Sequence, residues 1–154
     1  MESLAPASTH RHIAIRIKTS CPTEFIDLTD RLETLVVASG TQVGLLNVQS
    51  LHTTVGIVVN EHEPLLLTDF ATLLEKAAAR HASYRHDDMA ARTVNDERTN
   101  GHAHCQALLL GSCVCLNVSG GHLRLGQWQR VLMVELDGPR EREISVVILG
   151  EGGR

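Results

Sequence analysis

The sequence predicts an α+β fold, a mostly antiparallel β-sandwich with two or three helices. Segments rich in β-forming residues recur along the chain, two segments space their apolar residues as helices do, and the connections are short. These features favour such a sandwich over a doubly wound sheet. A chain of 154 residues is about the size of one domain. We expect a flexible N-terminus over residues 1–9 and a single domain over residues 10–150.

The first third of the chain is predicted to contain one strand and one helix. Residues 10–18 alternate apolar and polar side chains, which is the period of a half-buried strand. Residues 21–24 are typical of a helix start, with Thr23 as a candidate N-cap. The helix is expected to end near Gly40. Its apolar face is formed by Phe25, Leu28, Leu32 and Val36.

The rest of the chain is predicted to be strand-rich, with one more long helix. Residues 44–60 carry many β-formers and predict two strands or one long bent strand. A second helix is expected from Glu63-Pro64 to Ala79. Residues 87–100 lack sustained periodicity and predict a loop or short helix. Further strands, joined by glycine-rich turns, are expected at 103–111, 113–118, 130–135 and 144–149.

Composition excludes several classes of protein. A net charge of −4 and a pI near 6.1 argue against a nucleic-acid surface. No apolar stretch reaches the roughly 18 residues that span a bilayer, and the N-terminus lacks a signal-peptide pattern, so a cytoplasmic protein without a membrane partner is expected. The four cysteines are expected to be reduced, with Cys113 and Cys115 as small core residues of a strand.

Histidines are the most informative residues for chemistry. His102 and His104 stand two positions apart, and in a strand they would point to the same face and could bind one ion together. Further imidazoles are His52 at the head of an apolar run, His86 in a Tyr-Arg-His-Asp-Asp stretch, and His122 after two glycines. A metal or proton-transfer site is one interpretation, and ordinary hydrogen-bonded imidazoles are the other.

Three other segments carry candidate functional residues. Glu61 and Glu63 are candidate ligands or bases, or stabilise the start of the second helix. The glycine-rich segment 120–129 predicts either a binding loop or a hairpin whose Trp128 fills the core. The guanidinium groups of Arg140 and Arg142 could hold a phosphate or carboxylate, or form surface ion pairs beside a turn.

Taken together, several separated motifs resemble those of the YjbQ-like family, also described as secondary thiamine-phosphate synthase-like proteins. The resemblance covers nearly the whole chain and departs from the family pattern at Gln127, where the family usually has Thr. The motifs are His52-Thr-Thr54, Asn60-Glu61, Asp69, His86-Asp87, His104 with Gly111, Leu125 to Gln129, and Glu135 to Arg140.

The resemblance implies a homotrimer, a histidine cluster of His52, His86 and His104 near subunit boundaries, and thiamine-phosphate synthase activity. This activity joins a pyrimidine diphosphate to a thiazole phosphate. Its pyrophosphate leaves from a carbocation-like centre, so the site needs cations on the departing phosphates more than a strong base.

Our working hypothesis is therefore an enzyme with a divalent metal, zinc or similar, and a small-molecule phosphate substrate. The alternatives are a metal or small-ligand binding module without turnover and a metal-dependent phosphate-ester hydrolase. The hypothesis assigns the metal to His52, His86 and His104, catalysis to Glu61 and Asp87, and substrate binding to Asn60, Trp128, Gln129, Arg140 and Arg142.

Overall fold

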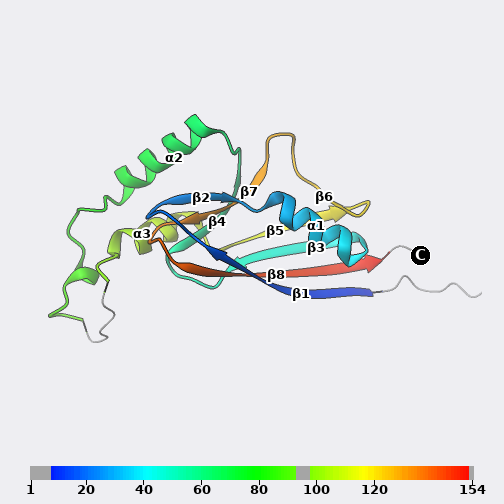
Figure 1. The fold of residues 1–154 in the computed structure, drawn as a ribbon, viewed down its shortest axis with the longest axis horizontal. Helices are drawn as coiled ribbons and strands as arrows, with labels where there is room; N and C mark the ends of the chain where they lie inside the picture. Colours follow the sequence, from blue (N-terminus) through cyan, green and yellow to red (C-terminus); the bar gives the residue numbers. More distant parts are fainter. Residues whose placement is uncertain (1–7, 93–97, 153–154) are drawn as a thin grey trace, which may run out of the picture.

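The computed structural model describes residues 8–92 and 98–152 and contains two antiparallel sheets (Figure 1). The larger sheet has the strand order β1-β8-β3-β5-β6, and the smaller has the order β2-β7-β4. The strands are β1 (Ser8–Lys18), β2 (Glu24–Asp27), β3 (Thr41–Ser50), β4 (Val55–Asn60), β5 (Cys113–Ser119), β6 (His122–Leu123), β7 (Arg130–Glu135) and β8 (Glu141–Gly152). The helices are α1 (Thr29–Ser39), α2 (Pro64–Ala77), α3 (Gly101–Leu110) and the short 3-10 helix η1 (Arg85–Asp87). The predicted α+β class is confirmed.

The first strand and the following helix differ from prediction at their edges. β1 begins at Ser8, so the predicted flexible segment overlaps it at residues 8 and 9, and residues 1–7 lie outside the described part of the chain. α1 begins at Thr29 rather than near Thr23, because the preceding residues form β2, which pairs with β7. The predicted helix end at Gly40 is confirmed, with the left-handed φ of 73° that glycine adopts without strain.

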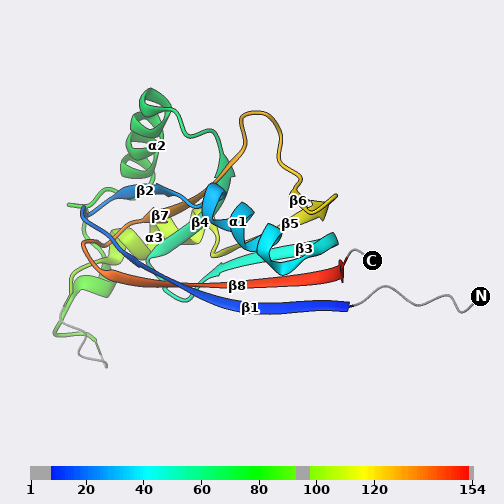
Figure 2. The ribbon, with the colours of Figure 1, turned by 45° about the vertical axis from the view of Figure 1, so that its right-hand side comes forward.

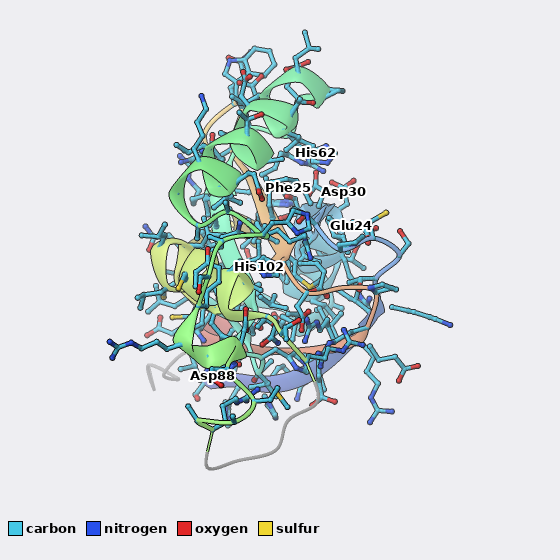
Figure 3. The ribbon with its side chains drawn as sticks, turned by 90° about the vertical axis from the view of Figure 1, so that its left-hand side faces the viewer. Glu24, Phe25, Asp30, His62, Asp88 and His102 are labelled. Atoms are coloured by element: carbon cyan, nitrogen blue, oxygen red, sulfur yellow. The ribbon has the colours of Figure 1, made fainter. Side chains whose placement is uncertain are left out.

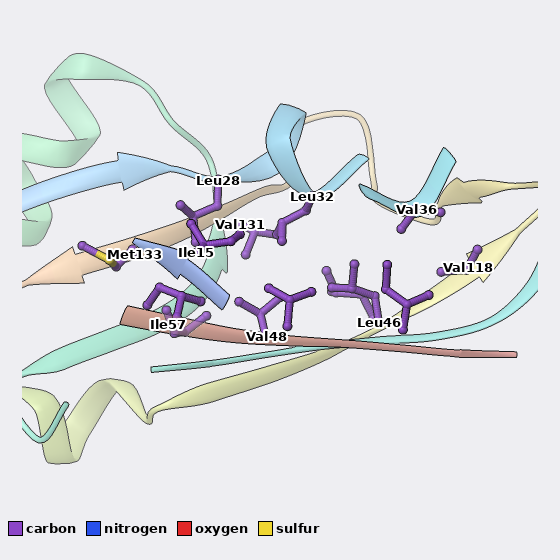
Figure 4. Packing of buried hydrophobic residues seen from close by; sticks show 14 of the residues in the cluster. Ile15, Leu28, Leu32, Val36, Leu46, Val48, Ile57, Val118, Val131 and Met133 are labelled. Carbon is purple, nitrogen blue, oxygen red and sulfur yellow. The ribbon is translucent and has the colours of Figure 1, made fainter. Parts of the chain in front are cut away.

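The core lies between the two sheets and α1 (Figures 2 and 4). Alternation along β8 sends every second side chain inward, so that Ile144 and Ile148 are fully buried, and Ile144 faces Ile15 across the β1–β8 ladder. Leu32 and Val36 of α1 close this core from the other side. The predicted apolar face of β1 is therefore confirmed, and that of α1 is confirmed for Leu32 and Val36, whereas Phe25 lies in β2 and Leu28 precedes the helix.

The prediction of a strand over residues 103–111 is wrong, because α3 spans Gly101–Leu110. A short apolar run carries no period that separates strand from helix. Tertiary contacts decide the conformation. Asp87 accepts a hydrogen bond from the first backbone N–H of the helix at 2.9 Å, and Gln106 donates to the carbonyls of Leu74 and Ala78 of the α2 segment at 3.2 and 2.9 Å.

The cysteine prediction is wrong about burial. Cys113 and Cys115 lie in a strand as expected, but their side chains are exposed on the outer face of the larger sheet. The inner face of β5 is taken by Leu116 and Val118, which are buried in the core. Among the described residues, no helix combines the length and the apolar character that crossing a bilayer requires.

Candidate functional site

A polar pocket of about 210 Å³ opens where the β3–β4 loop, the start of α3 and the β7–β8 turn meet. Its chemically active lining residues are His52, Asn100, His104, Arg140 and Arg142. A neighbouring hollow of about 280 Å³ shares His52 and His104 and continues along α3. Residues from three distant parts of the sequence thus form one concave site.

His52 is half-buried, and both of its ring nitrogens have defined roles. Its Nε2 accepts a hydrogen bond from the backbone N–H of Glu143 at 2.8 Å, so the proton of the neutral ring resides on Nδ1. Burial lowers the pKa of His52, and the positive charge of Arg142 lowers it further. His52 is therefore a neutral N–H donor at the pocket wall.

His86 and His104 form a close pair. Their ring centroids lie 4.7 Å apart in an edge-on arrangement, which joins η1 to α3. Asn100 donates from its amide nitrogen to Asp137 at 2.9 Å, which turns the amide oxygen towards Nε2 of His86 at 3.2 Å. A carbonyl oxygen only accepts, so His86 carries its proton on Nε2. In the neutral ring the lone pair then lies on Nδ1, which has no hydrogen-bond partner among the described residues.

Asp137 anchors this arrangement. It is 7% exposed and accepts hydrogen bonds from Asn100 and from the guanidinium group of Arg140, the latter at 2.7 Å. Neither Asn100 nor Asp137 was predicted as a site residue from spacing. The only signal for them in the sequence is that Asn100 stands two residues before His102 and that Asp137 lies within the Glu135 to Arg140 motif.

Asp87, predicted to be catalytic, has a structural contact. Its carboxylate receives the Gly101 N–H, as the helix-capping bond described above, and lies at the electropositive start of α3. This bond fixes the first turn of α3, and with it the position of His104. Asp87 thus helps to position His104 through the first turn of α3.

Arg142 is engaged by Glu135. The side chain of Arg142 is 3% exposed, and its Nε and Nη2 bind the two carboxylate oxygens at 2.6 and 2.5 Å, while Nη2 also donates to Thr54 at 3.1 Å. Burial raises the pKa of Glu135, but the hydrogen bonds from Arg142 and the Asp137 N–H outweigh it and hold that pKa below its ordinary value. The expectation that Arg142 holds phosphate is therefore incomplete, since this side chain first neutralises a buried acid.

The other predicted site residues lie elsewhere. β4 ends at Asn60, which Glu61 follows, and Trp128 and Gln129 precede β7. The histidine pocket adjoins the opposite ends of these strands. A six-residue strand is roughly 17–20 Å long, so a single chain keeps the two groups apart. Trp128 is 65% exposed, so the interpretation that it fills the core is wrong.

The pair that spacing favoured, His102 and His104, does not form. In α3, residues two positions apart diverge by roughly 200°. His104 faces the pocket, while His102, on the same helix (Figure 3), is 2% exposed and points into the interior. Within the described residues, neither ring nitrogen of His102 has a hydrogen-bond partner. His122 binds Glu33 on the far side of the fold.

The donor set of His52, His86 and His104 does not fit a metal ion in this conformation. The Nε2 lone pair of His52 takes the Glu143 N–H, and Nε2 of His86 faces Asn100. Among the described residues, no group of three His, Cys, Asp or Glu side chains is arranged to hold a metal. Metal binding would require at least His52 to turn away from its present hydrogen bond.

The family model described as UPF0047 protein YjbQ-like matches residues 13–151. The chain belongs to the YjbQ-like UPF0047 family. It is 38% identical over 135 residues to a UPF0047 protein of Methanothermobacter thermautotrophicus, a match that covers 88% of this chain and 89% of the relative. A UPF0047 protein of Archaeoglobus fulgidus is also 38% identical, with 88% of this chain and 98% of the relative covered.

Solved structures agree with this assignment. A YbjQ-like protein of unknown function from Sulfolobus solfataricus is 36% identical with a TM-score of 0.86, covering 94% of this chain and 100% of that chain. A hypothetical protein from Aeropyrum pernix is 33% identical with a TM-score of 0.82, covering 92% and 99%. Membership in a family of unknown function establishes the fold and leaves the chemistry to be argued from the pocket.

Proposed function

We propose that this YjbQ-like protein is an enzyme that acts on a small phosphate-bearing molecule in the histidine pocket. The observation that carries the proposal is the lining of the pocket, where two imidazoles and two guanidinium groups meet in about 210 Å³. Guanidinium groups bind phosphate oxygens bidentately, and imidazole N–H groups are further hydrogen-bond donors.

Phosphate binding here depends on directed donors more than on net charge. Arg140 is paired with Asp137, and Arg142 with Glu135, so the two ion pairs nearly cancel. The Nη1 groups of both arginines and the Nδ1–H of His52 are absent from those contacts and supply N–H groups to a ligand. Such a pocket favours a small phosphate ester over a highly charged polymer.

The histidine pair provides the proton transfer. Asn100 places the proton of the neutral His86 ring on Nε2, and His104, in edge-on contact with His86, is the member of the pair that lines the pocket. A positioned imidazole typically contributes on the order of 10²–10⁴-fold to rate as a general acid or base. Asn100 and Asp137 act as positioning residues for this pair.

The specific reaction that we propose is of the thiamine-phosphate synthase type, a transferase reaction in which N–H donors hold a departing diphosphate. Phosphate-ester hydrolysis is the second candidate, and the close pair of His86 and His104 favours it. Hydrolysis needs one group to accept a proton from water and another to donate a proton to the leaving oxygen. A binding module without turnover is the outcome if neither reaction occurs.

We also propose that the chain assembles as a homotrimer. Two leucines that line the pocket and the neighbouring hollow are exposed: Leu51 is 53% exposed and Leu108 85%. Contiguous exposed apolar surface marks an interaction site. Light scattering at micromolar concentration tests the proposal, and the mass of a single chain would refute it.

The decisive experiment compares four purified proteins: wild type, His86→Ala, His104→Ala and His10→Ala. His10 is an exposed histidine on β1 and serves as the matched control. Each is given the pyrimidine diphosphate with the thiazole phosphate, and separately a panel of phosphate esters. We expect turnover in wild type and His10→Ala, and losses of about 10²-fold or more in the two site variants.

Phosphate binding is measured separately by phosphorus NMR titration with inorganic phosphate. Equal turnover in all four proteins would remove the histidine pair from the mechanism. Phosphate binding without turnover of any substrate would leave the binding module as the function. Elemental analysis of wild-type protein purified without a His-tag tests for a divalent metal. A stoichiometric metal that is lost in His52→Ala would show that these histidines rearrange to bind it.

A further inference from the structure

A second cleft lies at the other end of β4 and β7, away from the histidine pocket. It encloses about 450 Å³ between the loop before α2 and the turn before β7. The residues that define its chemistry are Asp27, Glu61, Glu63, Trp128 and Arg130. In Figure 3, His62 of this cleft lies near Asp30 and apart from His102 and Asp88.

Trp128 is presented to this cleft by a fixed turn. The N–H of Gly126 donates to Oε1 of Gln129 at 2.8 Å, and the N–H of Gln129 donates back to the carbonyl of Gly126 at 3.0 Å. These two bonds close the turn on which the 65%-exposed indole stands. An aromatic side chain held out on a closed turn loses little conformational freedom when a flat ligand stacks on it.

The charges of the cleft are mainly negative. Three carboxylates and one guanidinium group line it. Arg130 is already paired with Asp27 at 2.6 Å and with Asp30 at 2.9 Å, and Glu63 accepts a backbone N–H from the first turn of α2. Within the described part of the chain, the carboxylate of Glu61 has no hydrogen bond or ion pair of its own. The cleft therefore holds an unneutralised negative charge in reach of an exposed indole.

We propose that this cleft is a binding site for a small, flat organic cation, which stacks on Trp128 and pairs with Glu61. The face of an indole attracts cations, and tryptophan does so best among the aromatic side chains. A carboxylate beside the ring adds an ion pair to the stacking. The histidine pocket is built from N–H donors, so the two ends of the small sheet select ligands of opposite charge.

Tryptophan fluorescence tests the site directly, because Trp128 is the only tryptophan of the chain. The probe is the 1-methylnicotinamide cation, and its control is nicotinamide, which has the same flat ring without the charge. We expect saturable quenching by the cation and weaker binding of nicotinamide. Glu61→Gln is expected to weaken binding of the cation about two- to fivefold, the range for one partly exposed ion pair, while Glu151→Gln on β8 leaves it unchanged.

Several results would overturn the proposal. Quenching that rises linearly, as for free N-acetyltryptophanamide, would mean that the cleft holds no ligand, and equal affinity for both probes would mean that it does not select charge. Emission typical of a buried indole in the ligand-free protein would mean that another chain covers Trp128. Calorimetry on Trp128→Phe, with the fold checked by circular dichroism, must also show weaker binding of the cation. His104→Ala should leave the titration unchanged, which separates this site from the proposed phosphate pocket.

Discussion

Replacing Arg142 by methionine should destabilise the fold rather than merely weaken substrate binding. Glu135 is 0% exposed, and Arg142 binds both of its carboxylate oxygens. Removing one partner of a buried ion pair leaves an uncompensated charge and costs about 3–5 kcal/mol. For a chain of this size, that loss lowers the Tm by about 6–20 °C.

The assay is urea unfolding at neutral pH, with two companion variants. Arg16→Met removes an ion pair with Glu143 in which the arginine side chain is 86% exposed, and the expected loss is at most about 1 kcal/mol. The double variant Glu135→Gln with Arg142→Met removes the buried charge, keeps an acceptor for the backbone N–H groups of the turn, and should be more stable than Arg142→Met alone. If Arg142→Met loses no more stability than Arg16→Met, the structural role of Arg142 is refuted.

The pH dependence gives the same prediction an independent check. In the wild type, the folded pKa of Glu135 lies below its ordinary value of 4.5, so its contribution to stability is present above pH 4.5 and is lost as the pH falls through the folded pKa. Without Arg142, burial dominates and raises that pKa, so protonation would favour the folded state. Acidification should therefore decrease the stability of the wild type and relieve part of the loss in Arg142→Met.

Three further predictions concern single positions. His102→Leu should leave the free energy of unfolding unchanged or raise it by about 1 kcal/mol, because the buried imidazole has no hydrogen-bond partner in the described part of the chain. A loss of more than about 2 kcal/mol in urea unfolding would contradict this. Leu32→Ala should cost about 2–5 kcal/mol, since Leu32 is 0% exposed in the core, and a loss below about 1 kcal/mol would show that the core collapses around the gap. Asn100→Leu should allow the His86 ring to adopt both tautomers instead of one, and nitrogen-15 NMR of the histidines measures the tautomer populations. An unchanged tautomer would show that Asn100 and Asp137 do not position His86.

Local patterns were sufficient where one periodicity prevailed. The alternation in β1 and the helical spacing through Leu32 and Val36 predicted elements that the structure confirms, and the glycine at position 40 marked the end of α1. The run from Ala103 to Gly111 had no such period, and its conformation depends on Asp87 and on the end of α2. Contacts between distant segments decide such ambiguous runs.

The candidate site shows the same division. The sequence by itself determined the α+β class and the resemblance to the YjbQ-like family, and that resemblance implied that His52, His86 and His104 form one cluster. Only the tertiary structure decided that Asn100 and Asp137 orient His86, that Glu135 engages Arg142, and that Trp128 belongs to a different cleft. The physical reason is that periodicity reports which face of an element is buried, whereas hydrogen bonds and ion pairs form between side chains that folding brings together from distant positions.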